Sequence, residues 1–236
     1  MKSITKKTIA LLVLVATSTA FAVNINSGAA SNSGFALSDG TDLATGSLIR
    51  IGVFTISDSL VSANASSFSF LNANFIQIGT SYIGQGNPFN AVSETNSANN
   101  GLFNSSLSSI NTTSEGLNIA TAKLSYWVFN ATTAVAATQQ GVFSSTTWAI
   151  PAGDASGTDT AFLNTDINDL TTSNDGQNLA ATARILIGGF GPGLNISGQG
   201  RDFTLASAIP EPATYAALFG LGVLGLAAFR RRRTAA

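Results

Sequence analysis

The sequence predicts a mainly β protein: an antiparallel, sandwich-like domain with at least one helix, followed by a single transmembrane helix. Three observations lead to this prediction. Apolar residues between positions 23 and 207 occur in short clusters separated by Ser, Thr, Asn and Gly, a pattern typical of short strands joined by turns. Residues 57–76 carry apolar side chains at helical spacing, and residues 213–229 form an almost uninterrupted apolar run.

The N-terminal segment has the organisation of a secretory signal peptide. Three lysines precede an apolar stretch at residues 8–15, and Ala20 and Ala22 place small side chains at both specificity positions of a signal-peptidase site. We therefore expect residues 1–22 to be removed and the exported domain to comprise residues 23–207. A permanent N-terminal anchor is the weaker alternative, because the apolar stretch is too short to span a bilayer.

Several strands can be predicted inside this domain. Residues 48–56 are apolar on both faces apart from Arg50, which indicates a central strand. Residues 124–129 and 142–150 flank a turn at 139–141 and are expected to pair as a hairpin. Further strands are predicted at residues 183–187 and 203–205, tight turns at 39–40 and 175–176, and a long loop rich in Asn and Ser at 87–114.

The helix is predicted from spacing. Its apolar or face-defining positions recur every three or four residues, at Leu60, Val61, Asn64, Phe68, Leu71 and Phe75. Ser57 or Asp58 can cap its start, and we expect it to end before Gly79 and to pack its phenylalanines on a sheet. A strand through Phe68 and Phe70 is the alternative, but it leaves the leucines of this pattern without a role.

The C-terminal segment, residues 208–236, combines three features. A Pro-Glu-Pro box at Pro210, Glu211 and Pro212 is followed by the apolar run at 213–229 and then by Arg230, Arg231, Arg232 and Arg233. Seventeen residues rise about 26 Å as a helix, at the lower limit for crossing a hydrocarbon core of about 30 Å. Clustered arginines resist translocation and stay in the cytoplasm. The segment therefore has the properties of a stop-transfer helix.

This segment resembles the PEP-CTERM sorting signal of bacterial exported proteins. The resemblance rests on Ile209 and the Pro-Glu-Pro box, the short apolar span and the arginine cluster; Ile209 stands where valine is frequent. The resemblance implies recognition by an exosortase, a membrane-embedded cysteine transpeptidase, with cleavage near Pro210–Pro212. It also implies a Gram-negative cell that makes exopolysaccharide, and delivery of the domain to the cell surface. An ordinary single-span anchor is the alternative, although such an anchor needs no Pro-Glu-Pro box.

Charge limits the partners of the exported domain. Residues 23–209 contain four basic and eleven acidic residues, a net charge of −7. Such a domain repels phosphate backbones, so we expect no nucleic-acid binding, and calcium or a cationic surface would suit it better. The sequence has no cysteine, so a conventional hydrophobic core has to supply its stability.

The residue types that the sequence lacks exclude several classes of catalytic site. The sequence contains no histidine and no cysteine, which excludes Ser-His-Asp and Cys-His arrangements and most zinc sites. A glycoside hydrolase needs two carboxylates across a sugar bond, and Glu94 and Glu115 could in principle meet. No aromatic-lined cleft is recognisable around them. We therefore predict a non-enzymatic protein without a cofactor and keep a glycoside hydrolase as a remote alternative.

Acidic residues are densest between positions 154 and 175. Asp154, Asp159, Asp166 and Asp169 lie among glycines and polar residues, and hard oxygen ligands at short spacing suit calcium. The order of residues matches no EF-hand loop. A solvated loop whose aspartates cap turns is therefore the stronger interpretation.

Tyr126, Trp127 and Trp148 are the residues that a carbohydrate-binding surface would use, because flat aromatic faces stack on sugar rings. Tyr126 and Trp127 point to opposite faces of one strand, so they cannot share a surface. A position in the core is the stronger interpretation for all three.

Together these observations predict a cell-surface or extracellular-matrix protein associated with exopolysaccharide or a biofilm. Its processing partners would be signal peptidase and an exosortase, and a single-pass form in the inner membrane would precede the mature form. A carbohydrate- or calcium-binding surface module is the alternative function of the domain.

Overall fold

Strands account for most of the regular structure in the computed structural model, which describes residues 22–29, 33–84, 102–111, 119–151, 161–172, 178–192 and 201–207. The strands are β1 (Ala22–Ala29), β2 (Phe35–Ala36), β3 (Leu48–Phe54), β4 (Phe75–Tyr82), β5 (Phe103–Asn111), β6 (Lys123–Phe129), β7 (Gln139–Ala149), β8 (Ala161–Asp166), β9 (Ala183–Ile187), β10 (Gly189–Pro192), β11 (Arg201–Thr204) and β12 (Ala206–Ser207). The helices are α1 (Asp58–Ala63), α2 (Phe68–Ala73) and the short 3-10 helix η3 (Ile167–Leu170). The mainly β prediction is thus confirmed.

Three sheets organise these strands. The largest has the order β12-β7-β6-β3-β4, with β9 also paired to β7, and all its pairs are antiparallel. A second sheet has the order β5-β1-β8, and a third has the order β10-β11-β2. The prediction of antiparallel pairing is wrong at two places, because β1–β8 and β11–β2 are parallel. Hairpins between neighbouring strands account for only part of the topology, because β1 pairs with β8, which lies far from it in the sequence.

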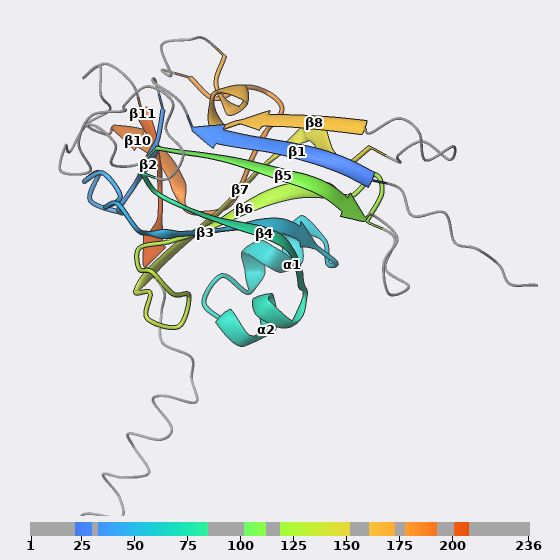
Figure 1. The fold of residues 1–236 in the computed structure, drawn as a ribbon. Coiled ribbons are helices and arrows are strands. Elements are labelled where there is room, and N and C mark those ends of the chain that lie inside the picture. The colour runs from blue at the N-terminus through green and yellow to red at the C-terminus, as the bar shows by residue number, and fades with distance from the viewer. Residues whose placement is uncertain are drawn as a thin grey trace, which may run out of the picture.

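The main core lies between the large sheet and the β5-β1-β8 sheet, which face each other like the layers of a sandwich (Figure 1). Val23 and Ile25 of β1 and Phe103 of β5 contribute from one sheet, while Ile51 of β3 and Tyr126 of β6 contribute from the other. Phe103 and Tyr126 meet edge to face with ring centroids 5.3 Å apart. Burial of these side chains holds the two sheets together.

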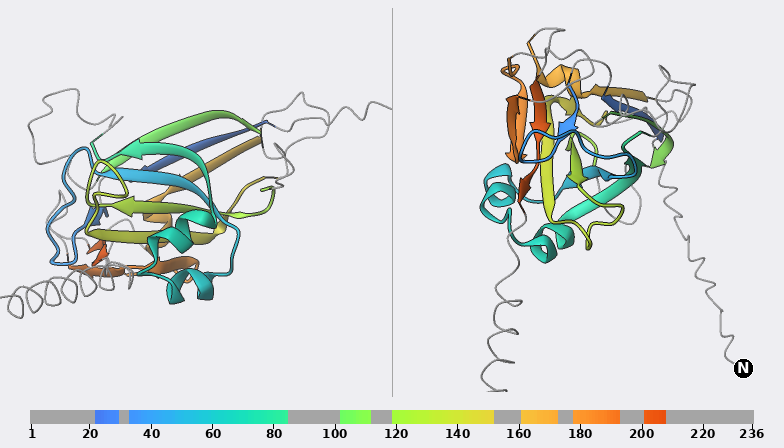
Figure 2. Two further views of the ribbon diagram at one scale, coloured as in Figure 1. Left: turned by 90° about the horizontal axis from the view of Figure 1, so that it is seen from below. Right: turned by 90° about the vertical axis from the view of Figure 1, so that its left-hand side faces the viewer.

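The helices cover the opposite face of the large sheet, and Figure 2 shows this third layer from two further sides. Here Trp127 and Phe129 of β6 pack with Val61 of α1, Leu71 of α2 and Phe75 of β4. Strand β6 is therefore buried on both faces, with alternate side chains in the two cores. This alternation confirms that Tyr126 and Trp127 point to opposite faces.

The predicted strands are largely confirmed. Strand β3 lies between β4 and β6, so the segment around residues 48–56 is central as expected. Strands β6 and β7 pair antiparallel, β9 covers the predicted residues 183–187, and β11 overlaps the predicted 203–205. Gly40 adopts a φ of 86° in the predicted turn at 39–40, whereas the predicted turn at 175–176 lies outside the described residues.

The single helix predicted at residues 57–76 is wrong in its length. Ser57 caps α1 as predicted, since its Oγ accepts a hydrogen bond from Leu60 N at 3.4 Å. Each helix then ends at an asparagine, because Asn64 donates through Nδ2 to the Leu60 carbonyl and Asn74 donates in the same way to the Phe70 carbonyl, both at 2.8 Å. The helical spacing is real, but it is divided between two short helices.

Two further boundaries differ from the prediction. Strand β4 begins at Phe75, the last apolar position of the predicted helix, and runs through Gly79. Strand β5 occupies residues 103–111 of the loop predicted at 87–114, and residues 87–101 and 112–114 lie outside the described residues. The polar composition of β5 obscured it, because this strand is held by backbone pairing to β1 and buries few side chains.

Within the described part of the chain, no helix has the length and apolar character needed to cross a membrane. The span predicted at residues 213–229 lies outside that part.

Candidate functional site at the ends of the folded domain

The predicted signal-peptidase site meets the fold at the first residue of β1. Ala22 pairs with Asn111 of β5, and Val23 is fully buried between Ile110 of β5 and Ala161 of β8; Ala20 lies outside the described residues. A protease needs its substrate strand to be accessible, and this strand is central in its sheet. Cleavage after Ala22 therefore requires that β1 has not yet paired with its neighbours.

The C-terminal end of the fold lies at the edge of the large sheet. Ser207 of β12 pairs with Gln139 of β7, and Leu205, just before β12, is 2% exposed and belongs to the main core. The sorting-signal residues Pro210, Glu211, Pro212 and Arg230, Arg231, Arg232 and Arg233 lie outside the described residues. Only two residues separate the last strand from the Pro-Glu-Pro box, so this box follows the folded domain directly.

The acidic candidates are partly used to build a turn. Asp166 and Asp169 form a capping box around η3: Asp166 Oδ1 accepts from Asn168 N at 2.9 Å, and Asp169 Oδ2 accepts from Asp166 N at 3.0 Å. Asp154 and Asp159 lie outside the described residues, among which no cluster of three or more metal-ligating His, Cys, Asp or Glu side chains occurs. The placement of Asp166 and Asp169 favours the interpretation that they cap a turn.

The aromatic candidates for sugar binding are core residues. Tyr126 and Trp127 are fully buried, and Trp148 is 1% exposed. Trp127 donates through Nε1 to Gln140 Oε1 at 3.0 Å, and Trp148 donates to Asp169 Oδ2 at 3.0 Å. Their faces contact other rings rather than solvent, so a carbohydrate site built on these three residues is wrong.

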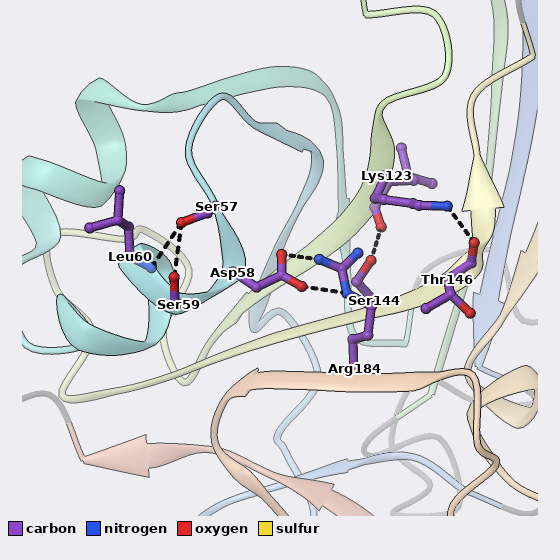
Figure 3. A network of polar contacts seen from close by, with 9 residues as sticks. Ser57, Asp58, Ser59, Leu60, Lys123, Ser144, Thr146 and Arg184 are labelled. Atoms are coloured by element: carbon purple, nitrogen blue, oxygen red, sulfur yellow. Dashed lines mark hydrogen bonds and ion pairs between the residues drawn. The ribbon is translucent and has the colours of Figure 1, made fainter.

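The four basic residues of the domain are all engaged within the fold. Arg184 on β9 pairs with Asp58 on α1, its Nε donating to Asp58 Oδ2 at 2.6 Å, and Lys123 Nζ donates to the Thr146 carbonyl at 2.5 Å (Figure 3). Arg50 lies 4.9 Å from the ring centroids of both Phe75 and Trp127, and Arg201 lies 5.9 Å from that of Phe190. These four cations lie apart on different elements and each is occupied by a contact within the fold.

A buried hydroxyl network joins the two facing sheets. Tyr126 Oη lies 2.5 Å from Thr165 Oγ1 on β8, which lies 3.1 Å from Ser27 Oγ on β1. Burial raises the pKa of Tyr126, and its hydroxyl contacts offset only part of this effect. The phenol therefore stays neutral and acts as a structural bridge. Sequence reasoning placed Tyr126 in the core but had no signal for this bridge.

We expect Tyr126→Phe to lower the free energy of unfolding by about 1–2 kcal/mol, because buried polar groups lose a partner while the ring packing remains. Urea unfolding of the purified protein measures this change. Tyr82→Phe, at a side chain that is 39% exposed, is the control and should change stability by less than about 0.5 kcal/mol. Equal effects of both substitutions would contradict the bridging role.

Comparison with known proteins identifies the C-terminal segment. Residues 208–233 match the family model of the PEP-CTERM protein-sorting motif. No curated protein matches the chain, and no solved structure matches its fold. The motif begins at the residue after β12, where the structure places the end of the folded domain. The chain is therefore a PEP-CTERM domain-containing protein, an exported, membrane-transiting protein of a Gram-negative bacterium that is targeted to an exosortase through residues 208–233.

Proposed function

We propose that this protein is a non-enzymatic component of the cell surface or of the exopolysaccharide matrix. Signal peptidase removes residues 1–22, and the helix at 213–229 then holds the protein in the inner membrane with Arg230–Arg233 in the cytoplasm. An exosortase cleaves near Pro210–Pro212 and releases the folded domain towards the surface. The observation that carries this proposal is the sorting motif that follows directly on the last strand.

The short connection between fold and membrane helix supports this order of events. Residues 208–212 can span at most about 18 Å when fully extended. Before cleavage, the edge of the sheet that carries β12 therefore lies close to the membrane. The loop at residues 130–138 precedes Gln139, the partner of Ser207, and it contains no charged residue. This loop can approach a membrane surface, or the enzyme within it, without the cost of desolvating a charge of its own.

The composition of the domain supports a structural role rather than catalysis. The chain lacks histidine and cysteine, the usual bases and nucleophiles, and the described basic residues are occupied by contacts within the fold. Two hydrophobic cores stabilise it without disulfides. Such a domain can persist outside the cell independently of redox conditions.

Pulse-labelling with cell fractionation tests the proposal. In wild-type cells the label should pass from a full-length form in the inner membrane to a shorter form in the surface or matrix fraction. In cells that lack exosortase, the longer form should accumulate in the inner membrane. Appearance of the same shorter form outside both kinds of cell would overturn the proposed route.

A further inference from the structure

Asp202, in the small sheet, is a buried carboxylate without a cationic partner among the described residues. Its side chain is 1% exposed, and its Oδ1 accepts a hydrogen bond from Gly34 N at 2.9 Å. Its Oδ2 is buried and has no hydrogen-bond partner in the described part of the chain. An unpaired carboxylate oxygen in the interior is costly unless a proton or a cation neutralises it.

A second carboxylate lies on the same face of this sheet. Phe203 of β11 pairs with Phe35 of β2, and Ala36 of β2 forms an antiparallel bridge with Asp42. Because side chains alternate, the buried Phe35 and Phe203 point into the main core, while Asp202 and Asp42 point to the opposite face. The register therefore brings two acidic side chains to one side of a three-stranded sheet.

The electrostatics agree with this placement. Burial and the charge of Asp202 raise the pKa of Asp42 to about 6, and burial raises the pKa of Asp202. Residues next to Asp202 offer no compensating charge: Gly191 is its partner on β10, and Arg201 lies against the Phe190 ring. One divalent cation would neutralise the two facing carboxylates together.

We infer that Asp202 and Asp42 bind a divalent cation of the calcium class, at the strand pairs β11–β2 and β2–Asp42. Hard carboxylate oxygens are the preferred ligands of calcium, which completes its shell with backbone carbonyls and water. The hydroxyl oxygen of Ser33, one residue before Gly34, is also buried and without a hydrogen-bond partner among the described residues. This site uses none of the acidic residues at 154–175 and does not depend on how the C-terminus is processed.

Calcium titration tests this inference directly. The probe is CaCl2, added at pH 7.5 to the protein purified in detergent and freed of metal with EDTA. Calcium at a hundredfold excess over Kd should raise Tm by about 5 °C or more, and calorimetry should show one site per chain. Asp202→Asn and Asp42→Asn should abolish the Tm shift and the heat of binding. Asp39→Asn, in the adjacent exposed turn, should keep both.

Measurements on the EDTA-treated protein show whether a cation or a proton neutralises the two carboxylates. Asp42 and Asp202, whose pKa values are both raised, stabilise the fold when protonated, below the unfolded value of 3.8, and lose that contribution as the pH rises through their folded values, which is about 6 for Asp42. Asp202→Asn should therefore raise the Tm of the metal-free protein at pH 7.5, which a mere folding defect would not do. A wild-type protein that gains Tm on acidification to pH 5 but neither binds nor responds to calcium at pH 7.5 would overturn the inference.

Discussion

Trp127→Ala is expected to lower the free energy of unfolding by about 4 kcal/mol or more, as removal of a large buried aromatic side chain does. Trp127 is fully buried at the centre of the second core, where its ring contacts Phe54, Phe68, Phe75 and Phe129. The substitution would also leave Gln140 Oε1 without its donor and remove one of the two rings beside Arg50. A loss of this size is a large share of the 5–15 kcal/mol typical of a folded domain.

Denaturant unfolding followed by circular dichroism measures this effect. Trp127→Phe keeps an aromatic ring but loses the donor to Gln140, so it should cost about 1–2 kcal/mol. Val135→Ala, at a side chain that is 87% exposed, should stay within about 0.5 kcal/mol of wild type. A cost below about 1 kcal/mol for Trp127→Ala would mean that the helices are not held to the sheet by this core.

Simultaneous replacement of Pro210, Glu211 and Pro212 by alanine is expected to abolish C-terminal processing. These residues form the box that names the sorting motif, and they lie directly after the folded domain. The variant should remain full length in the inner membrane, because the apolar run and the arginine cluster are unchanged. Immunoblotting of membrane and surface fractions measures the two forms.

Ile209→Val is the matched control for this variant. It alters the neighbouring residue but keeps a branched apolar side chain, so processing should match wild type. Unchanged Tm values for both proteins would show that the domain itself is intact. Normal processing of the triple-alanine protein would contradict recognition through the Pro-Glu-Pro box.

The strands with strong apolar patterns could be predicted from the sequence. Residues 48–54 and 124–129 bury nearly every side chain, so their composition alone marks them as central. Strand β5 could not be predicted in this way, because its stability comes from backbone pairing with β1 and its side chains are mostly Ser and Asn. The parallel pairing of β1 with β8 joins segments more than 130 residues apart, and no local pattern encodes it.

The helix shows a second limit of periodicity. Val61 and Leu71 face the same core, so the spacing predicted one helix, whereas the side chains of Asn64 and Asn74 end two. An asparagine side chain at a single position can end a helix. The hydrophobic spacing that predicts a helix is read over many residues and does not reveal such a position. The Asp42–Asp202 pair was missed for a related reason: the two residues are far apart in sequence, and only the register of β11 with β2 and the bridge between Ala36 and Asp42 bring them to one face.

Terminal-peptide mass spectrometry of the protein recovered from the surface fraction of its native cells tests the central claim most directly. The expected product is a chain that starts at Val23 and ends near Pro210–Pro212, with the fold from β1 to β12 retained between them. A surface-fraction chain that still ends at Ala236 would contradict it, because the motif would then serve only as a membrane anchor.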